Sequence, residues 1–207
     1  SDVVFEVSSA DTGEATVSPA QLTFTSSNWN TAQTVTVTGV DDSAVDGTQT
    51  TAVTVAVVDG SSDDAYDPVA DSTVSVTTSD DDTASFTLSG TAVTVSEAGS
   101  TATFTAVLGT QPSSDVVLGV SSADTGEATV SPATLTFTSG NWSTAQTVTV
   151  TGVDDSLSDG NQTTAVTVAV VDGSSDNAFD ALADQTVTVT TSDDDSPGVS
   201  ISESDGS

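Results

Sequence analysis

The chain has 207 residues, of which 31 are acidic and none is Lys, Arg or His, so its formal net charge at pH 7 is −31. Binding to nucleic-acid phosphates or to anionic membranes needs basic side chains, and this composition supplies none. The absence of Cys and His excludes disulfides, thiolate zinc sites and an ordinary proton shuttle near neutral pH. Carboxylates, hydroxyls and amides remain, and these are ligands for hard cations such as calcium.

The acidity is not that of a disordered tail, because 35% of the residues are hydrophobic. Val and Thr gather in short runs, which is the composition of β-strands. Gly, Asp, Ser and Asn separate these runs, as turns require. The longest apolar runs are only a few residues, so no membrane-spanning helix is predicted.

An internal repeat organises the chain. Residues 1–82 and 114–195 align without gaps at an offset of 113 and differ at 14 of 82 positions. This similarity indicates a recent duplication and a tandem array. We therefore expect residues 1–82 to be a repeat without its first strands, 83–195 to be a complete repeat and 196–207 to begin a third. The chain is interpreted as a window from a longer array.

The complete repeat shows period-2 alternation, which predicts strands with one buried face. Short strands at this spacing, without helical periodicity, predict an all-β chain of tandem antiparallel Ig-like β-sandwiches. In chain order the alternating apolar positions are Phe86 and Leu88; Val93 and Val95; Phe104, Ala106 and Leu108; Val116, Leu118 and Val120; Leu135 and Phe137; Val148 and Val150; Val166, Val168 and Val170; and Val187 and Val189.

Acidic residues of the complete repeat fall in the loops between these strands. If consecutive strands run antiparallel, several of these loops reach the same end of the sandwich. Carboxylates that converge repel one another, at about 1 kcal/mol per pair in water at 4 Å and several-fold more when partly buried. Calcium takes 6–8 oxygens and is the natural counter-charge in a chain without Lys or Arg, although a solvated acidic loop is the plainer alternative. The clustered residues are Glu97, Glu127, Asp154, Asp155, Asp159, Asp193, Asp194 and Asp195.

Several motifs of the repeat are similar to those of one known family. They are Thr94-Val95-Ser96-Glu97, Gly152-Val153-Asp154-Asp155 followed by Asp159, and the run from Val187 to Asp195. In this order and spacing they resemble the Calx-β domain, a calcium-binding β-sandwich, and in particular the tandem repeats of giant bacterial surface adhesins.

The resemblance implies calcium as the bound ion and assigns ligands. Glu97 matches the family's early Glu, Asp154 and Asp155 its central Asp pair, and Asp193 to Asp195 its terminal triplet. Asp159 matches an acid just beyond the pair, Glu127 falls where the family has an Asp ligand, and Gln162 replaces a further acid. The equivalents in the first copy are Glu14, Asp41, Asp42, Asp46, Asp80, Asp81 and Asp82.

Three other features allow a structural or a functional interpretation. Rows of Thr, such as residues 147, 149 and 151 or 186, 188 and 190, are either a solvated strand face or a hydroxyl array that binds ice or glycan. The acidic loop from Asp59 to Asp67, repeated from Asp172 to Asp180, is either a polar turn or a separate cation site. Trp29 and its copy Trp142 either close the end of the core or offer a sugar platform.

Together these observations predict a non-enzymatic, calcium-binding structural repeat of an extracellular bacterial surface protein. In this reading calcium stiffens a spacer, and the partners are neighbouring repeats of the same polypeptide. Two alternatives are a glycan- or ice-binding module and a filament or sheath subunit that identical chains complete by strand exchange.

Overall fold

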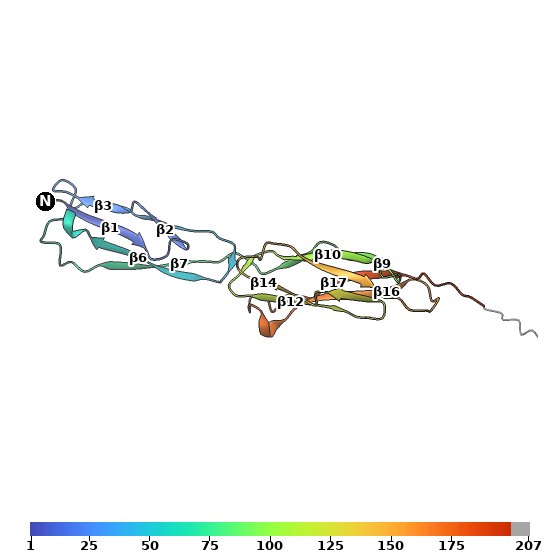
Figure 1. Cartoon of the computed structure of the whole chain (residues 1–207). Coiled ribbons are helices and arrows are strands. Elements are labelled where there is room, and N and C mark those ends of the chain that lie inside the picture. Colours follow the sequence, from blue (N-terminus) through green and yellow to red (C-terminus); the bar gives the residue numbers. More distant parts are fainter. Residues whose placement is uncertain (200–207) are drawn as a thin grey trace, which may run out of the picture. The chain divides into compact units, whose positions relative to one another are not determined.

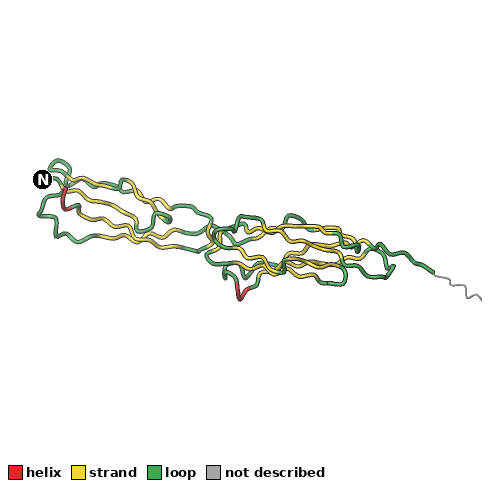
Figure 2. The backbone as a smooth tube through the Cα atoms, viewed as in Figure 1, coloured by secondary structure: helices red, strands yellow, loops and turns green. Residues whose placement is uncertain are grey.

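Val and Thr alternate along most strands, so one face of each strand is apolar and must be buried. A computed structural model describes residues 1–199, in which the chain forms two units, Ser1–Asp82 and Thr83–Ser207 (Figure 1). The predicted start of a third repeat lies mostly at residues 200–207, outside the described residues. Outside two one-turn 3-10 helices, the described residues form strands and loops (Figure 2). Among them is no helix long and apolar enough to cross a membrane.

Unit 2 is a β-sandwich of two sheets with strand orders β13-β15-β10-β8 and β14-β12-β16-β17-β9. The all-β sandwich fold predicted from the alternation is therefore confirmed. The elements are β8 (Phe86–Leu88), β9 (Ala92–Ser96), β10 (Thr101–Leu108), β11 (Gln111–Pro112), β12 (Val116–Ser122), β13 (Ala128–Ser131), β14 (Thr134–Phe137), β15 (Gln146–Gly152), β16 (Gln162–Val170), η2 (Asp172–Ser174) and β17 (Gln185–Ser192).

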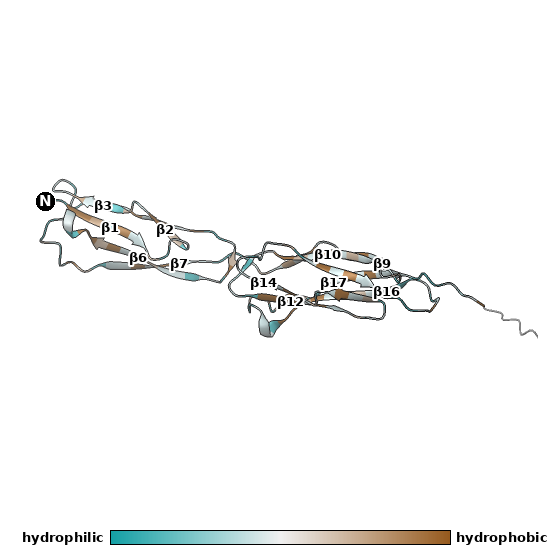
Figure 3. Ribbon diagram, in the orientation of Figure 1, coloured by the Kyte–Doolittle hydropathy of each residue, from teal (hydrophilic) through white to brown (hydrophobic). Residues whose placement is uncertain are grey.

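The core of unit 2 lies between the inward faces of these sheets. Phe104 of β10 pairs with Val148 of β15 in one sheet, and Val166 of β16 pairs with Val187 of β17 in the other. All four side chains are at most 2% exposed. Brown hydrophobic positions alternate with paler ones along these strands in Figure 3. The hydrophobic pattern thus fixes the register, because a slip of one residue would turn each Val outward.

Two details of unit 2 differ from the sequence prediction. One pair is parallel, because β9 lies beside β17 with Ala92 opposite Thr188 and Ser96 opposite Ser192. The short strand β13 was not predicted, since only Ala128 and Val130 mark its apolar face. It nevertheless pairs with β15 over four residues, from Ala128 opposite Gly152 to Ser131 opposite Thr149.

Unit 1 repeats this arrangement with fewer strands. Its sheets have the orders β3-β1-β6-β7 and β2-β4. A small core of Val7, Leu22 and Val53 holds the larger sheet. The elements are β1 (Val3–Ser9), β2 (Ala15–Ser18), β3 (Gln21–Phe24), β4 (Thr36–Gly39), β5 (Ala44–Val45), β6 (Gln49–Val57), η1 (Asp59–Ser61) and β7 (Ser72–Thr78).

The Thr rows and the Trp residues have defined places. In unit 2 the Thr rows 147, 149, 151 and 186, 188, 190 alternate with the fully buried Val of β15 and β17, so they lie on the outer faces of the sandwich. Trp142 is partly buried, whereas Trp29 is 71% exposed. The interpretation in which a Trp closes the end of the core therefore does not hold for Trp29.

Equivalent Val residues in the two units provide a test of this packing. Val187 is fully buried, whereas its counterpart Val74 is 57% exposed. We expect Val187→Ala to lower the unfolding free energy of unit 2 by about 2 kcal/mol, from lost burial and a residual cavity. Val74→Ala should change that of unit 1 by less than about 0.5 kcal/mol. Urea unfolding followed at Trp142 or Trp29, in variants that keep one Trp each, measures the two units separately, and equal losses would contradict the assignment.

Candidate metal centre

The acidic loops of unit 2 meet at one end of the sandwich. Because β9 and β17 are parallel, the turn after Ser96 and the segment after Ser192 leave the sheet at the same end. The backbone N–H of Glu97 donates to Ser192 O at 3.1 Å, and that of Gly152 donates to Ser100 O at 3.0 Å. Glu97 and the terminal Asp triplet are therefore brought together although almost a hundred residues separate them.

A first group of carboxylates consists of Glu97, Asp193 and Asp195. One oxygen of each lies within 4.8 Å of the others. Glu97 is only 1% exposed, and its Oε2 has no hydrogen-bond partner among the described residues. Asp195 Oδ2 is likewise buried without a partner there. A buried carboxylate oxygen with no donor is costly, and a cation at this position would satisfy it.

A second group consists of Glu127, Asp155 and Asp159, again with one oxygen of each within 4.8 Å of the others. Glu127 immediately precedes β13, and the other two lie in the loop between β15 and β16. Glu127 Oε2 is buried and has no hydrogen-bond partner in the described part of the chain. Both groups therefore fit a hard cation by donor type and by an unpartnered oxygen.

Burial and like charge both act on these carboxylates. Desolvation, followed by the charges of Asp193, Asp155 and Glu127, raises the pKa of Glu97, although a backbone hydrogen bond from Asp194 acts against this rise. Desolvation also raises the pKa of Glu127, with neighbouring Asp charges adding to it. The pKa of Asp195 is raised by the same causes. Ionisation of Glu97, Glu127 and Asp195 is thus disfavoured without a positive charge nearby.

Two glycines allow the loops to take these paths. Gly160 has a φ of +80°, a conformation that favours glycine, and its N–H donates to Asp193 Oδ2 at 2.6 Å. At Gly152 an added Cβ would lie 2.2 Å from Ser96 O. Any side chain there would push away the backbone that carries Glu97. In the sequence, the only signal of this role is that Gly152 begins the Gly-Val-Asp-Asp motif.

Not all of the predicted ligands of unit 2 join these groups. Asp154 and Asp194 have no carboxylate oxygen in either group of three. Each is adjacent in sequence to a residue that does belong to one of the groups. Their predicted role as ligands stays a prediction.

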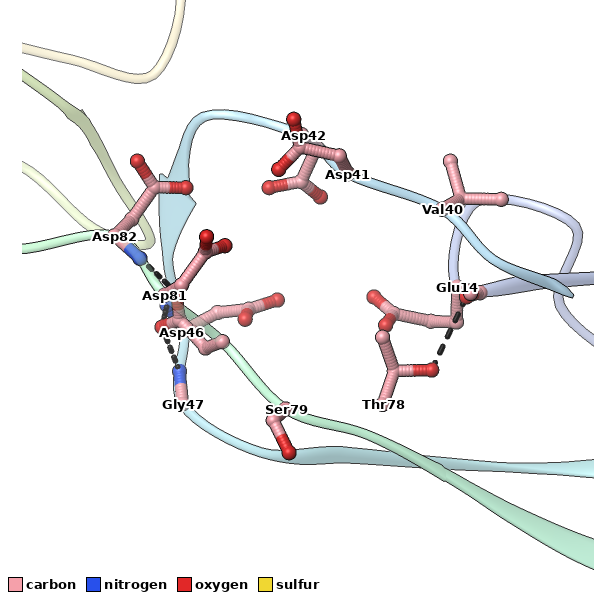
Figure 4. Close-up of a pocket in the computed structure, with 12 residues that line it drawn as sticks. Glu14, Val40, Asp41, Asp42, Asp46, Gly47, Thr78, Ser79, Asp81 and Asp82 are labelled. Atoms are coloured by element: carbon pink, nitrogen blue, oxygen red, sulfur yellow. Dashed lines mark hydrogen bonds between the residues drawn. The ribbon is translucent and has the colours of Figure 1, made fainter.

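The seven acids predicted in unit 1 all line one pocket of about 400 Å³. Figure 4 shows their side chains around a common space, with Asp41 and Asp42 on one side and Glu14 on another. Asp80 Oδ2 accepts hydrogen bonds from the N–H groups of Asp46 and Gly47 at 3.1 and 2.7 Å. Among the described residues, the close groups of three carboxylates both lie in unit 2. No residue of 1–82 corresponds to Glu97, because 97 minus the offset of 113 falls before Ser1.

The surroundings of the pocket in unit 1 lower the pKa of one of its acids and raise the pKa of two others. Backbone hydrogen bonds from Asp82 and Gly47 lower the pKa of Asp80. Desolvation, with the charges of Asp46 and other neighbours, raises the pKa of Glu14. Desolvation and the charge of Asp80 raise the pKa of Asp82. The equivalent acids of unit 1 thus line one pocket, but those described form no group of three carboxylates as close as the two in unit 2.

The second acidic loop of unit 2 has a visible structural role. Asp176 is 6% exposed, and its Oδ2 accepts hydrogen bonds from the N–H and Oγ of Ser113 and from the N–H of Ser114, at 2.7 to 3.0 Å. Its Oδ1 accepts from the N–H of Ala178 at 3.0 Å. These bonds lower the pKa of Asp176 despite desolvation. This carboxylate is thus satisfied by the protein, as in a polar turn.

Comparisons with known proteins give only distant structural likenesses. No protein-family model and no curated protein matches the sequence. Domains 4 and 5 of the S-layer protein SbsC align over 91% of this chain and 70% of theirs, with 20% identity and a TM-score of 0.43. The E. coli chaperone DraB aligns over 55% of this chain and 58% of its own, with 10% identity and a TM-score of 0.40. The PapD-like domain 7 of human CEP192 aligns over 54% of this chain and 87% of its own length, with 11% identity and a TM-score of 0.40. At these values the likenesses identify no family.

Removing the charge of the buried Glu97 tests whether the first group of carboxylates binds calcium. We expect Glu97→Gln to weaken calcium binding by unit 2 at least about tenfold, because an anionic ligand is lost. In EGTA the same variant should melt no lower than the wild type, because the buried charge disfavoured by desolvation is gone. Calorimetric titration and thermal melts measure the two effects. Asp184→Asn, an exposed charge outside both groups, is the control, and wild-type affinity in Glu97→Gln would contradict the assignment.

The pH dependence of the metal-free protein follows from the raised pKa values. A carboxyl whose folded-state pKa exceeds its unfolded value of about 4.5 stabilises the fold below that value and loses this contribution as pH rises through the folded pKa. In EGTA, unit 2 should therefore gain thermal stability as pH falls from 7 to about 5. With excess calcium the trend should reverse, because protons compete with the ion. Melts at both pH values, with and without calcium, check this, and a fall in EGTA would contradict it.

Proposed function

We propose that the chain is a calcium-binding structural repeat of an extracellular bacterial surface protein, of the Calx-β kind. It acts as a spacer whose folded units are stiffened by bound ions, without catalytic activity. The observation that carries this proposal is Glu97, a carboxylate 1% exposed with an unpartnered Oε2, beside Asp193 and Asp195. The chain has no Lys, Arg or His side chain to neutralise it.

The donor set supports calcium over other divalent ions. All the donors of both groups are carboxylate oxygens, which favour hard cations. Calcium accepts 6–8 oxygens in flexible geometry, so backbone carbonyls and waters can complete the shell. Magnesium keeps most of its waters and is held by few carboxylates. Extracellular modules bind calcium at about 0.1–1 mM, which matches the concentration outside cells.

Calcium would stiffen the unit by joining segments that are distant in sequence. In the first group an ion would join the turn after β9 to the segment after β17, and in the second it would join the start of β13 to the loop after β15. The terminal triplet at Asp195 leads directly toward the next predicted repeat. We infer that ions held there limit the bending of the chain where one repeat meets the next, and that neighbouring repeats are the partners.

Calcium removal is the direct test of this proposal. Calcium at about 100 times its dissociation constant should raise the unfolding free energy of unit 2 by about 2.7 kcal/mol for each site. We expect EGTA to lower the melting temperature and to broaden the distribution of shapes measured by small-angle X-ray scattering. Magnesium at equal concentration is the control and should restore little of either. Identical melting and scattering in calcium and in EGTA would overturn the proposal.

A further inference from the structure

The row of buried Val residues in β17 ends in a threonine. The inward positions of this strand are Val187, Val189 and Thr191, and all three are fully buried. Val and Thr have the same branched shape, so a Val at position 191 would fill this place and add apolar burial. A buried hydroxyl costs free energy unless a hydrogen bond satisfies it. The hydrogen bond that this hydroxyl makes is therefore what distinguishes Thr from Val here.

The Thr191 hydroxyl joins the two sheets at the acidic end of unit 2. Its Oγ1 donates to the backbone oxygen of Glu127 at 3.2 Å. β17 belongs to one sheet, whereas Glu127 immediately precedes β13 in the other. The same oxygen of Glu127 accepts from the N–H of Val153 at 3.0 Å, two residues before Asp155. This three-way contact holds the backbone of Glu127 against the end of β17 and against the segment that leads to Asp155.

The hydroxyl is not needed to satisfy the Glu127 carbonyl, because Val153 already donates to it. One donor is enough to avoid an unsatisfied acceptor, although a carbonyl oxygen can take two. The second donor instead holds Glu127 from the opposite sheet. The Oε2 of this residue is buried without a partner in the described part of the chain. One oxygen of its carboxylate lies within 4.8 Å of oxygens of Asp155 and Asp159.

A second buried threonine holds the other end of the same loop. Thr164 is 8% exposed, and its Oγ1 accepts from the N–H of Asp124 at 3.1 Å. The backbone oxygen of Asp124 accepts from the N–H of Ala128 at 3.1 Å, which closes the loop before β13. Hydroxyl groups of the five-stranded sheet therefore hold residues 124–127 at both ends.

The three-way contact recurs in unit 1. There Thr78 Oγ1 donates to Glu14 O at 3.1 Å, as a dashed line in Figure 4 shows, and the N–H of Val40 donates to the same oxygen at 2.9 Å. These residues match those of unit 2 at the repeat offset of 113. By contrast, Thr51, the counterpart of Thr164, has an Oγ1 without a hydrogen-bond partner among the described residues. The contact made from the last strand is thus the one that both units keep.

We propose that Thr191 is a positioning residue for the second group of carboxylates. Its hydroxyl holds Glu127 where this carboxylate can share a cation with Asp155 and Asp159. The inference rests on the proposed function, because calcium is the ion concerned, and it adds a residue that acts through the backbone of Glu127. Substituting a residue that orients a metal ligand typically lowers metal affinity by about 10- to 100-fold.

Two substitutions of Thr191 separate its hydroxyl from its methyl group. Thr191→Val keeps the shape and removes the hydrogen bond, whereas Thr191→Ser keeps the bond and removes a buried methyl. Thr188→Val is the matched control, because this exposed position lies in the same strand and takes the same change. The parent is the 207-residue chain with Trp29→Phe and Glu97→Gln. In this parent Trp142 reports on unit 2, and the first group has lost its buried charge.

The melting temperature of unit 2, followed at Trp142, measures calcium binding by the second group through the rise that calcium causes. Thr191→Val should need at least about tenfold more calcium than the parent for the same rise. Thr191→Ser and Thr188→Val should need no more calcium than the parent. In EGTA the order changes, and Thr191→Ser should melt about 4 °C lower because a buried methyl is lost. Thr191→Val should melt within about 2 °C of the parent there.

Amide hydrogen exchange in EGTA provides a readout that needs no calcium. The N–H groups of Ala128 and Val153 both donate to the held loop. Thr191→Val should speed their exchange at least about fivefold, whereas the amide of Val189 in the core should exchange as in the parent. Thr188→Val should change none of these rates.

The outcomes separate this inference from the proposed function. Parent-like exchange or parent-like calcium dependence in Thr191→Val would overturn the inference. So would a parent that shows no calcium effect while the wild-type chain shows one, because the second group would then bind no ion. Faster exchange in Thr191→Val, together with no effect of calcium on the wild-type chain, would overturn the proposed function but support the hold of the hydroxyl on Glu127.

Discussion

Carboxylates that converge without a positive side chain are the constraint on which the rest of the molecule depends. The strand alternation buries Val and exposes Thr, and this leaves the acids in the loops. The parallel β9–β17 pair then brings Glu97 beside Asp193 and Asp195. Repulsion at this spacing opposes the close approach of these loops, and it is stronger where the oxygens are buried. The sandwich closes against this repulsion because its Val, Leu and Phe core is large.

A comparison of the two units shows what residues 83–113 add to the fold. Unit 1 retains a sheet around Val7, Leu22 and Val53 without β8, β9 and β10. Unit 2 adds Phe86, Val95 and Phe104 from these strands, and its Val150 and Val187 are fully buried, unlike their counterparts in unit 1. The segment also delivers Glu97, so one stretch of sequence completes both the apolar core and the acidic end. Core packing and the assembly of the acidic end are therefore coupled through this segment.

Much of the fold could be predicted from sequence because a period of two specifies which face of a strand is buried. Val148 and Val150 were assigned to the core on this basis and are fully buried. Antiparallel order also predicted that several acidic loops reach one end, but the place of Glu97 beside the terminal triplet depends on the parallel β9–β17 pair, which was not predicted. The division of these acids into two groups could not be predicted, because it depends on loop paths such as the left-handed turn at Gly160. The exposure of Trp29 could not be predicted either, since its copy Trp142, in a nearly identical stretch of sequence, is partly buried.

The position of β17 bears on how unit 2 resists tension. β17 pairs with β16 over seven residues on one side and with β9 over five on the other. A force that pulls on the end of β17 acts along the strand axis, because the chain leaves the sheet in that direction. Hydrogen bonds of both ladders are then loaded together in shear and do not open one after another. Forced unfolding is governed by the unfolding rate, so this central place of the last strand favours a unit that lengthens little under load.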